Sequence, residues 1–412
     1  MFIKLATKSL INRKGSVLLT LLAMTVSIFV LLGVEHIRHQ AKESFANTVS
    51  GVDLIVGART GNLNLLLYSV FRIGSPTNNI SWESYEAIAA DRNVEWTIPI
   101  SLGDSHKGYR VMGTTQDYFE YFSYGQQHKL TFESGAPFQS VYDAVLGYEV
   151  AKKLDYQLGD ELTLAHGIAS TSFSRHDDRP FKVVGILAPT GTPVDQTVHV
   201  SLQGIEAIHV GWQQGVKLPG RTLTAEQAAQ LELTPKSITA FMVGLKSRIV
   251  TFRVQSQINK YPHEPLLAIL PGVALSELWQ MMGLLENTLR LISVLVLVAA
   301  LLGMSAMLLA SIRERDHEIQ LLRTVGAPPM FLFLLIELEA LIISFLSIVL
   351  STSTLYLCLI TLEELLIAQF GLHIKTSILS ENSVLLVAII VGATFVAAAI
   401  PSLSAYRKAS AV

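Results

Sequence analysis

Hydrophobic and polar positions along the chain separate four long apolar stretches from one long segment of mixed composition. The apolar stretches cover residues 16–34, 291–312, 340–362 and 383–406, and none of them contains a charged residue. Each has 19 to 24 residues, which at about 1.5 Å per helical residue is enough to cross a hydrocarbon core of about 30 Å. About 255 residues separate the first stretch from the second. The pattern therefore predicts a membrane α-helical protein with four transmembrane helices and a large domain inserted between helices 1 and 2.

The long inserted segment predicts a mixed α/β domain, placed at residues 46–274. Short apolar or alternating runs predict strands, whereas apolar residues recurring three and four positions apart predict helices. The predicted strands are 143–147, 161–165, 181–187, 198–201 and 240–246. The predicted helices are 82–90, 148–154, 203–210, 225–233 and 248–260. Residues 212–238 are polar and rich in loop-forming residues, which indicates the edge of a subdomain.

Two segments flanking this domain, residues 35–45 and 275–290, are predicted to continue membrane helices 1 and 2 as stalks that pack together. The second segment carries an apolar seam at three- and four-residue spacings. The seam residues are Leu278, Met281, Met282, Leu285 and Leu289. A rigid stalk would carry movement of the membrane helices to the domain.

The distribution of basic residues predicts the orientation of the helices. Lysine and arginine are concentrated in the N-terminal tail, the segment between helices 2 and 3, and the C-terminal tail, whereas the loop between helices 3 and 4 has one lysine against three glutamates. The positive-inside rule therefore places both termini and residues 313–329 in the cytoplasm and the large domain outside. The predicted order is a cytoplasmic segment 1–15, helix 1 and stalk 16–45, the external domain 46–274, stalk and helix 2 275–312, the cytoplasmic loop 313–329, helix 3 330–362, a short external loop 363–382, helix 4 383–406 and the tail 407–412.

The cytoplasmic N-terminal segment has a basic amphipathic pattern. On a helix, Lys4, Lys8 and Asn12 share one face, and the opposite face is apolar. The apolar residues are Phe2, Ile3, Leu5, Ala6 and Leu10. We predict a helix along the cytoplasmic membrane surface; the alternative is a disordered basic tail.

Composition supports a membrane protein. Half of the residues are hydrophobic and 16% are charged, and the mean hydropathy is +0.44. The net charge of −2 argues against a nucleic-acid partner, which would require a basic surface. The only cysteine, Cys358, lies in the third apolar stretch, so the external domain has no thiol, as suits an oxidising compartment. The first apolar stretch is too long for a signal-peptide core and has no cleavage site after it, which favours an uncleaved helix.

The cytoplasmic loop contains an amphipathic helical pattern. Ile319, Leu322 and Val325 form an apolar stripe among charged residues, and Gly326 followed by two prolines ends the pattern. The stripe needs a surface on which to be buried. The bilayer surface and a groove on a cytoplasmic partner both satisfy this requirement.

This loop resembles the loop after the second helix in ABC transporter permeases of the MacB, LolC/LolE and FtsX type. The matching residues are Glu314, Arg315, Glu318, Ile319, Leu321, Leu322, Arg323, Gly326 and Ala327. Residues 10–14, 144–160, 181–187 and 400–407 are similar to other segments of the same family, and so is the order of one helix, a large domain and three helices.

The resemblance implies a dimeric permease of the bacterial inner membrane that is driven by a separate cytoplasmic ATPase, with its large domain in the periplasm. The loop would dock on the ATPase through Glu314, Arg315, Glu318, Ile319, Leu322, Arg323 and Gly326. The implied partners are that ATPase, a second permease copy or a paralogue, membrane lipid, and a periplasmic protein or lipoprotein. The chain has no G-x-x-x-x-G-K-[ST] phosphate loop, so we expect a non-catalytic subunit without a cofactor, with ATP bound by the partner. MacB itself differs, since it carries its ATPase on the same polypeptide.

Catalytic and metal sites receive little support from the sequence. His176 with Asp177 and Asp178, near His166 and His199, could form a metal cluster, but no pair has a tight ligand spacing and an exposed polar loop explains them equally well. Ser172, Ser174 and His176 lack the glycines of a nucleophile elbow. Glu337 and Glu339 are near the cytoplasmic loop and are interpreted as membrane-interface residues rather than proton carriers. We therefore expect no metal and no catalytic residue, although the segment 166–178 leaves the metal question open.

Two functional classes follow from these features. The first is a permease that transmits ATP-driven motion to its periplasmic domain for export, extraction or release of a substrate. The second is an FtsX-like membrane scaffold that regulates a periplasmic partner such as a cell-wall hydrolase. The external domain is much longer than that of FtsX-type proteins, which favours the first class. The cargo stays open among lipoprotein, peptide, lipid, drug and metal-linked substrates.

Overall fold

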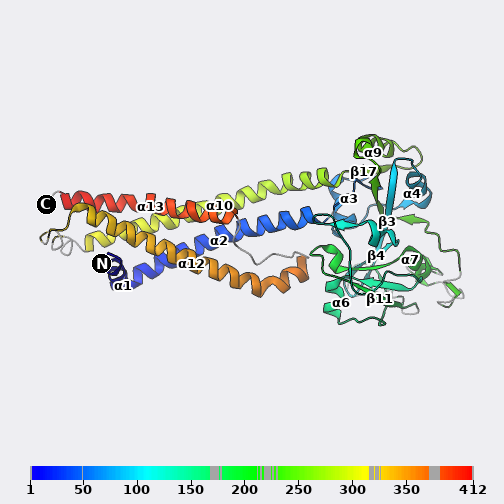
Figure 1. Cartoon of the computed structure of the whole chain (residues 1–412), viewed down its shortest axis with the longest axis horizontal. Coiled ribbons are helices and arrows are strands. Elements are labelled where there is room, and N and C mark those ends of the chain that lie inside the picture. The colour runs from blue at the N-terminus through cyan, green and yellow to red at the C-terminus, as the bar shows by residue number, and fades with distance from the viewer. Residues whose placement is uncertain are drawn as a thin grey trace. The chain divides into compact units, whose positions relative to one another are not determined.

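The computed structural model of the chain describes residues 2–48, 50–167, 176, 179–210, 212–213, 216–217, 224, 227–228, 231–314, 320, 324, 326–370 and 381–410. The chain divides into two compact units (Figure 1). The helical unit consists of Met1–Ala41, Met282–Gln369 and Ile374–Val412. The mixed unit consists of Lys42–Met281 with Phe370–His373.

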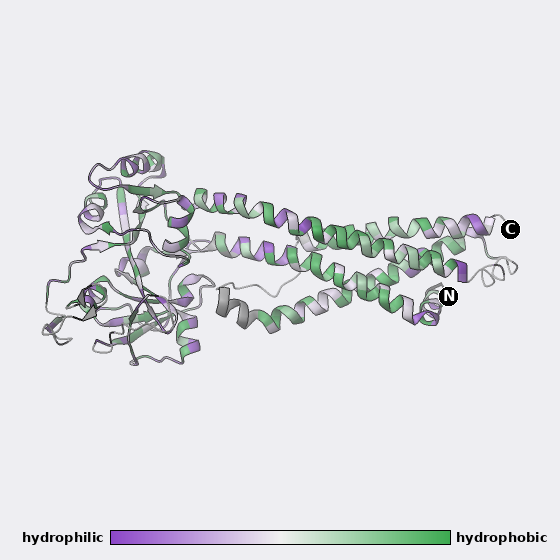
Figure 2. Cartoon of the chain, turned by 180° about the vertical axis from the view of Figure 1, so that it is seen from behind, coloured by the Kyte–Doolittle hydropathy of each residue, from purple (hydrophilic) through white to green (hydrophobic). Residues whose placement is uncertain are grey.

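Long helices build the helical unit. They are α1 (Phe2–Asn12), α2 (Lys14–Asn47), α10 (Pro271–Glu314), α12 (Pro329–Phe370) and α13 (Glu381–Ser410). Four of them contain stretches long and apolar enough to cross a membrane, namely Lys14–Glu43, Pro271–Glu314, Pro329–Leu362 and Ser383–Lys408. Figure 2 shows these stretches as continuous hydrophobic ribbon. The four apolar helices predicted from the sequence are therefore present.

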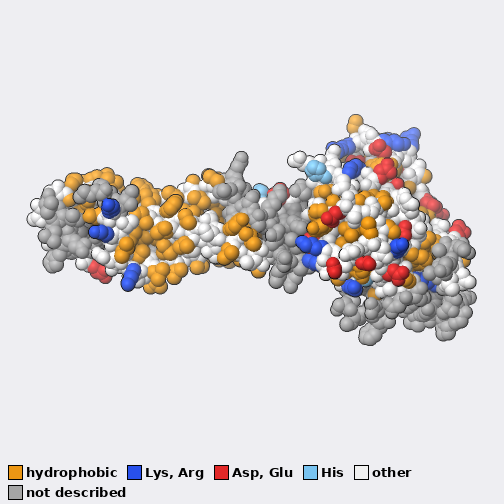
Figure 3. Space-filling model, turned by 60° about the horizontal axis from the view of Figure 1, so that its bottom comes forward, with side chains coloured by type: hydrophobic (Ala, Val, Ile, Leu, Met, Phe, Trp, Pro, Cys, Tyr) orange, Lys and Arg blue, Asp and Glu red, His pale blue; other side chains and the backbone are white. Residues whose placement is uncertain are grey.

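The helical unit distributes its side chains as expected for a bundle surrounded by lipid. Large apolar residues such as Leu19, Phe345 and Val396 are exposed, and Figure 3 shows hydrophobic side chains spread over the surface of this unit. Small polar residues lie between the helices instead. The Ser305 hydroxyl donates to the Ala397 carbonyl over 2.8 Å. Hydroxyls of this kind bond across helices because no water satisfies them in lipid.

A large sheet forms the mixed unit. Its strand order is β17-β1-β16-β3-β4-β12-β8-β11-β7, with β10 paired to β3 and β9 paired to β11. The strands are β1 (Leu54–Ala58), β3 (Val94–His106), β4 (Tyr109–Thr114), β7 (Phe132–Gly135), β8 (Asp143–Leu146), β9 (Glu161–Leu162), β10 (Ala165–His166), β11 (Phe181–Leu187), β12 (Thr197–Ser201), β16 (Ala240–Leu245) and β17 (Leu266–Ile269). Three short pairs complete the strands: β2 (Ile80–Ser81) with β15 (Ser237–Ile238), β5 (Ser123–Tyr124) with β6 (His128–Lys129), and β13 (Trp212–Gln213) with β14 (Val216–Lys217). Most neighbours in the large sheet are antiparallel, but β12 runs parallel to β4 and β11 parallel to β8.

Short helices pack against this sheet. They are α3 (Asn62–Ser69), α4 (Trp82–Ala89), α5 (Asp117–Tyr121), α6 (Tyr148–Leu154), α7 (Leu202–His209) and α9 (Thr251–Asn259), with 3₁₀ turns at Pro193–Gln196 and Arg248–Val250. Serine residues start two of the helices: the Ser81 side chain accepts from the Ser84 backbone N–H, and the Ser201 side chain accepts from the Gly204 backbone N–H. Helix α7 packs on β12 and β4, and α9 packs on β17.

The segment from β8 to α6 explains one motif of the sequence. Strand β8 is buried, and Gly147 stands between it and α6 in an extended conformation. A Cβ atom at Gly147 would collide with the backbone carbonyls of Val194 and Asp195, so only glycine allows this close approach. Helix α6 ends at Asp155, whose φ of 54° is left-handed. The motif therefore joins α6 to the turn before β12.

The local predictions for this unit agree closely with the structure. Helix α6 and strand β11 have the predicted bounds, and β8, β12, β16, α4 and α7 differ from theirs by one residue at one or both ends. The predicted strand 161–165 is two short strands, β9 and β10, and the predicted helix 248–260 is a 3₁₀ turn followed by α9. The predicted helix 225–233 is largely outside the described residues.

Candidate functional site

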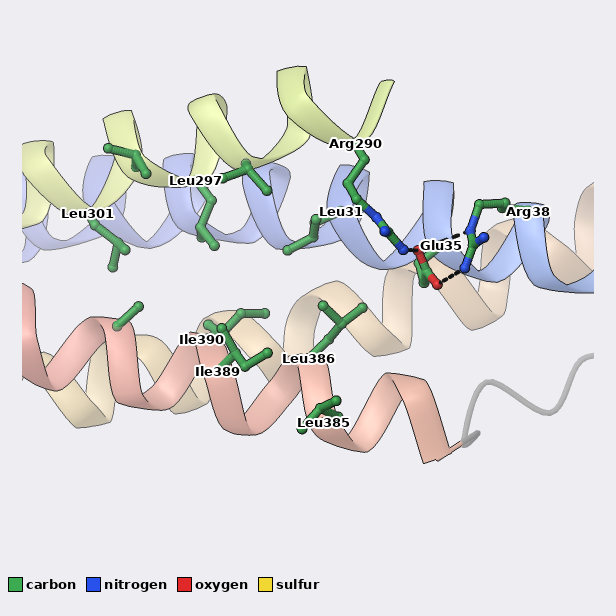
Figure 4. A pocket seen from close by; sticks show the side chains of 13 residues that line it. Leu31, Glu35, Arg38, Arg290, Leu297, Leu301, Leu385, Leu386, Ile389 and Ile390 are labelled. Atoms are coloured by element: carbon green, nitrogen blue, oxygen red, sulfur yellow. Dashed lines mark hydrogen bonds and ion pairs between the residues drawn. The ribbon is translucent and has the colours of Figure 1, made fainter. Parts of the chain in front are cut away.

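A cluster of charged side chains joins α2 and α10 within the helical unit. The Glu35 carboxylate accepts from Arg290 Nη2 over 2.9 Å and from Arg38 Nε over 3.3 Å. Arg38 Nη1 lies 3.6 Å from Glu286 Oε2. Glu35 and Arg38 belong to α2, whereas Glu286 and Arg290 belong to α10. The two carboxylates therefore hold two guanidinium groups between the helices, as Figure 4 shows for Glu35.

A cavity of about 490 Å³ opens beside this cluster. Leucine, isoleucine and valine side chains of α2, α10 and α13 line most of it, and Glu35, Arg38 and Arg290 form its polar end (Figure 4). The lining includes Leu31, Leu297, Leu301, Leu386 and Ile390. An apolar cavity with one charged end suits an amphipathic occupant such as a lipid.

The seam predicted on the second stalk is exposed in the single chain. Met281 is 68% exposed and Leu285 is 55% exposed, and Met282 and Leu289 are exposed as well. Leu278 is half-buried. The prediction that this seam packs the two stalk segments together is therefore wrong for these four residues. Within the helical unit, the contact between α2 and α10 at this level is made by the charged cluster instead.

The N-terminal helix is bonded to α12 by a buried ion pair. Arg13 Nη2 lies 3.0 Å from Glu339 Oε2, and the Ser9 hydroxyl also donates to the Glu339 carboxylate. Ala6 and Leu10 are buried, whereas Lys4 and Lys8 are exposed, as the amphipathic pattern predicts. Glu339 is only 1% exposed. The interpretation of Glu339 as a residue facing the membrane interface is therefore wrong, because Arg13 and Ser9 enclose it.

Glu337 is also buried, at 3% exposed. Its place among the helices likewise differs from the expected interface position. The described residues provide no basic partner for Glu337 at ion-pair distance.

The coupling segment is described only at its two ends. Glu314 is the last residue of α10 and is exposed. Gly326 has a φ of +98°, a left-handed conformation that favours glycine at the end of a helix. Helix α12 then begins at Pro329, where a missing N–H costs nothing. Arg315, Glu318, Ile319, Leu322 and Arg323 lie outside the described residues, so their role stays a prediction.

The histidines singled out in the sequence separate into two places in the mixed unit. His166 and His176 come together, with 3.1 Å between their Nε2 atoms. Asp104 and His209 join them, although nothing in the sequence near positions 166–178 points to these two residues. Their signal is tertiary, since His209 follows His166 by 43 residues. Asp177, Asp178, Ser172 and Ser174 are outside the described residues.

His199 is elsewhere, in the core of the sheet. Its ring stacks on Tyr118 with 5.3 Å between ring centroids, and its Nδ1 lies 3.3 Å from the Val145 carbonyl oxygen. Burial lowers the pKa of His199 from 6.5 to about 3, and the nearby Arg72 guanidinium lowers it further. His199 is therefore a neutral core residue and not a member of the histidine cluster.

Comparisons with known proteins match nearly the whole chain. A family model for the MacB-like periplasmic core domain matches residues 17–261, and a model for the FtsX-like permease C-terminal domain matches residues 290–410. None of the curated proteins compared with the chain is significantly similar to it.

Two solved structures resemble part of the chain. One is the periplasmic region of MacB from Actinobacillus actinomycetemcomitans, with 10% identity, a TM-score of 0.36, and coverage of 56% of this chain and 94% of that one. The other is the extracellular domain of the noncanonic ABC-type transporter YknZ from Gram-positive bacteria, with 11% identity, a TM-score of 0.31, and coverage of 53% and 98%. Scores this low carry no argument about detailed geometry, so the assignment rests on the two family models.

Proposed function

The chain belongs to the MacB/FtsX-type family of ABC transporter permeases, and we propose that it transmits ATP-driven motion from a separate cytoplasmic ATPase to its extracytoplasmic domain. The work done there is export, extraction or release of a substrate. The chain is a multi-pass membrane protein, and the membrane is the bacterial inner membrane, with the mixed unit in the periplasm.

The continuity of two helices carries this proposal. Helix α10 contains the second apolar span and runs without interruption from Pro271 to Glu314. Helix α2 likewise contains the first span and continues to Asn47. Each helix therefore has residues in both compact units. A helix is a stiff connection, so displacement of its cytoplasmic end is carried along its length.

ATP hydrolysis belongs to a partner. The chain has no phosphate loop of the G-x-x-x-x-G-K-[ST] type, and the family to which it belongs consists of permease components. The docking surface for the ATPase is the segment from Glu314 to Gly326, which begins where α10 ends. Movement of this segment would act directly on α10.

A second permease copy or a paralogue covers the exposed seam on α10. Met281, Met282, Leu285 and Leu289 are all exposed in the single chain, and a contiguous apolar stripe at helical spacing is typical of an interface. Periplasmic proteins or lipoproteins would engage the mixed unit, and lipid surrounds the four spans.

A flexible insertion in α10 tests the relay. Gly-Gly-Ser-Gly placed after Gln280 interrupts the helix, since glycine costs about 1 kcal/mol per helical residue, and the insertion falls within the stretch common to both units. We expect ATP hydrolysis by the assembled complex to continue while transport is lost, measured as the ratio of substrate moved to ATP hydrolysed in membrane vesicles.

The matched control is the same insertion after Gln126, in the exposed turn between β5 and β6. It should leave both activities unchanged. Full transport by the well-expressed Gln280 insertion would refute the rigid relay, and an equal decrease in protein level, hydrolysis and transport would assign only a structural role to this part of α10.

A further inference from the structure

Four side chains of the mixed unit converge although they come from four different segments. Asp104, His166, His176 and His209 each offer one ligand atom, and these atoms all lie within 4.8 Å of one another. Asp104 is on β3, His166 on β10, and His209 is the last residue of α7. His176 lies between β10 and β11. We propose that these four residues form a Zn²⁺ site in the extracytoplasmic domain.

The backbone places Asp104 and His166 opposite each other. They are register partners in the antiparallel pairing of β3 with β10, and the adjacent Gly167 N–H donates to the Gly103 carbonyl over 3.0 Å. The pairing of β3 with β4 is irregular between Leu102 and Ser105. A bulge of this kind redirects side chains and is frequent beside functional sites. As a result the Asp104 carboxylate is buried, and its Oδ1 lies 2.9 Å from His166 Nδ1.

His209 presents a lone pair to this pair of residues. Its Nδ1 lies 2.6 Å from the Ile205 carbonyl oxygen, which only accepts hydrogen bonds, so Nδ1 carries the proton. The other nitrogen, Nε2, is then the basic one. It lies 3.4 Å from His166 Nδ1 and 3.9 Å from Asp104 Oδ1. Metal-binding histidines commonly have this arrangement, with the second nitrogen bonded to a carbonyl that fixes the tautomer and the ring orientation.

The end of α7 that carries His209 is itself held in place. Arg179 is buried, and its Nη1 donates to the carbonyl oxygens of Ala207 and Val210. These contacts occupy carbonyl groups at the C-terminal end of the helix, which have no partner within it. His209 is therefore positioned before any ion binds.

His176 completes the set from the fully buried side. It is 0% exposed, and its backbone N–H donates to the Leu164 carbonyl over 2.9 Å. Its ring is nearly perpendicular to those of His166 and His209, at 79° and 83°. The rings of His166 and His209 are instead stacked, at 24°. His176 therefore approaches from a different direction than the other two imidazoles, as a fourth ligand must in a tetrahedral site.

The distances and donor types fit zinc. Ligand bonds of about 2.0–2.1 Å in a tetrahedron place ligand atoms about 3.3 Å apart. The triangle of Asp104 Oδ1, His166 Nδ1 and His209 Nε2 has edges of 2.9, 3.4 and 3.9 Å, which bracket that value. Three imidazoles with one carboxylate suit Zn²⁺, whereas Ca²⁺ and Mg²⁺ prefer oxygen ligands alone. A dication also compensates the buried charge of Asp104, which is costly without a partner.

The arrangement indicates a structural ion that exchanges with the solvent. Four protein ligands close the coordination sphere, whereas a catalytic zinc keeps one position open. The side chains of His166 and His209 are 26% and 32% exposed, so the ion reaches the site from the surface. When bound, it ties the β3–β10 pair to the end of α7. The site is independent of the relay proposed for α2 and α10.

Metal binding by the full-length chain tests this site. The chain is purified in detergent without a polyhistidine tag, stripped with EDTA, and supplied with Zn²⁺ alone. We expect about one Zn²⁺ per chain by mass spectrometry of the metal, with a higher melting temperature. Co²⁺ in place of Zn²⁺ should give the intense visible absorption of a tetrahedral site, which reports geometry directly.

Two variants and one control locate the ion. Second-shell partners alone are worth about 10–100-fold in metal affinity, so His209→Gln and Asp104→Asn, which each remove a ligand, should lower affinity by about 100-fold or more. His128→Gln changes an exposed histidine on β6 and should bind like the wild type. Wild-type protein that binds no Zn²⁺ would overturn the proposal and leave a purely hydrogen-bonded cluster. Undiminished binding by the folded His209→Gln variant, or binding of Cu²⁺ but not Zn²⁺, would overturn it as well.

Discussion

At the scale of single residues, His199 should make the mixed unit sensitive to acid. Its pKa is about 3 in the folded chain and 6.5 in a solvated histidine. Between these values the unfolded chain binds the proton and the folded chain does not, so stability falls as the pH falls from 6.5 towards 3. The loss from pH 7 to pH 5 is about 2 kcal/mol, or about 4–8 °C in melting temperature for a domain of this size.

A His199→Gln variant isolates this effect. Glutamine keeps a polar side chain near the Val145 carbonyl but does not titrate, so the difference in melting temperature between wild type and variant should shrink by about 4–8 °C as the pH falls from 7 to 5. Melting curves of the full chain in detergent at several pH values measure it. Parallel pH profiles for the two proteins would show that His199 is accessible to protons in the folded state.

The residues of the histidine cluster show where sequence reasoning reaches its limit. His166 and His176 drew attention because they are ten residues apart beside two aspartates. Asp104 and His209 offered no such signal, because their proximity depends on a strand register and on where α7 ends. The same reasoning grouped His199 with the other histidines, although it points into the core. Spacing along the chain predicts contacts only within one element.

At the scale of secondary-structure elements, the buried pair of Arg13 and Glu339 should determine whether α1 stays docked on α12. Removing one partner from a buried ion pair leaves an uncompensated charge and typically costs about 3–5 kcal/mol, whereas replacing both with apolar residues is often neutral. We expect Glu339→Met alone to lower the melting temperature and to expose α1 to protease, and the double variant Arg13→Met with Glu339→Met to recover most of the loss.

The exposed ion pair between Lys153 and Glu149 on α6 provides the comparison, because surface pairs are worth only about 0–1 kcal/mol. Lys153→Met should therefore change the melting temperature little. A double variant at positions 13 and 339 that is no more stable than Glu339→Met alone would show that α1 is held by its apolar contacts rather than by the pair.

Elements with uniform local patterns were predictable, and elements shaped by the sheet were not. Strand β11 alternates between buried and more exposed positions along its whole length, and α6 begins after a glycine and ends in a left-handed residue, so both have the predicted bounds. Strand β3 was missed, since Pro99 and the irregularity near Gly103 interrupt its alternation. Strand β1 is buried at all five positions, and such short apolar runs have no period to detect.

At the scale of the whole molecule, the distribution of charge leads to a definite topology. The basic residues of the tails and of the segment after α10 should remain in the cytoplasm, because translocating them across the membrane is unfavourable. Four spans with both ends on one side place the mixed unit on the other. Ile249 of the mixed unit is 92% exposed and Thr324 of the coupling segment is also exposed, so both positions suit chemical labelling.

Single cysteines at these two positions test the topology. In a Cys358→Ser background, Ile249→Cys should react with a membrane-impermeant maleimide in intact spheroplasts, whereas Thr324→Cys should react only after the membrane is opened with detergent. Equal reactivity of both variants after solubilisation controls for local access, and the cysteine-free background should not be labelled. Labelling of Thr324→Cys but not Ile249→Cys in intact spheroplasts would reverse the orientation. The segment from Glu314 to Gly326 would then face away from any cytoplasmic ATPase, and the coupling proposed for it would be wrong.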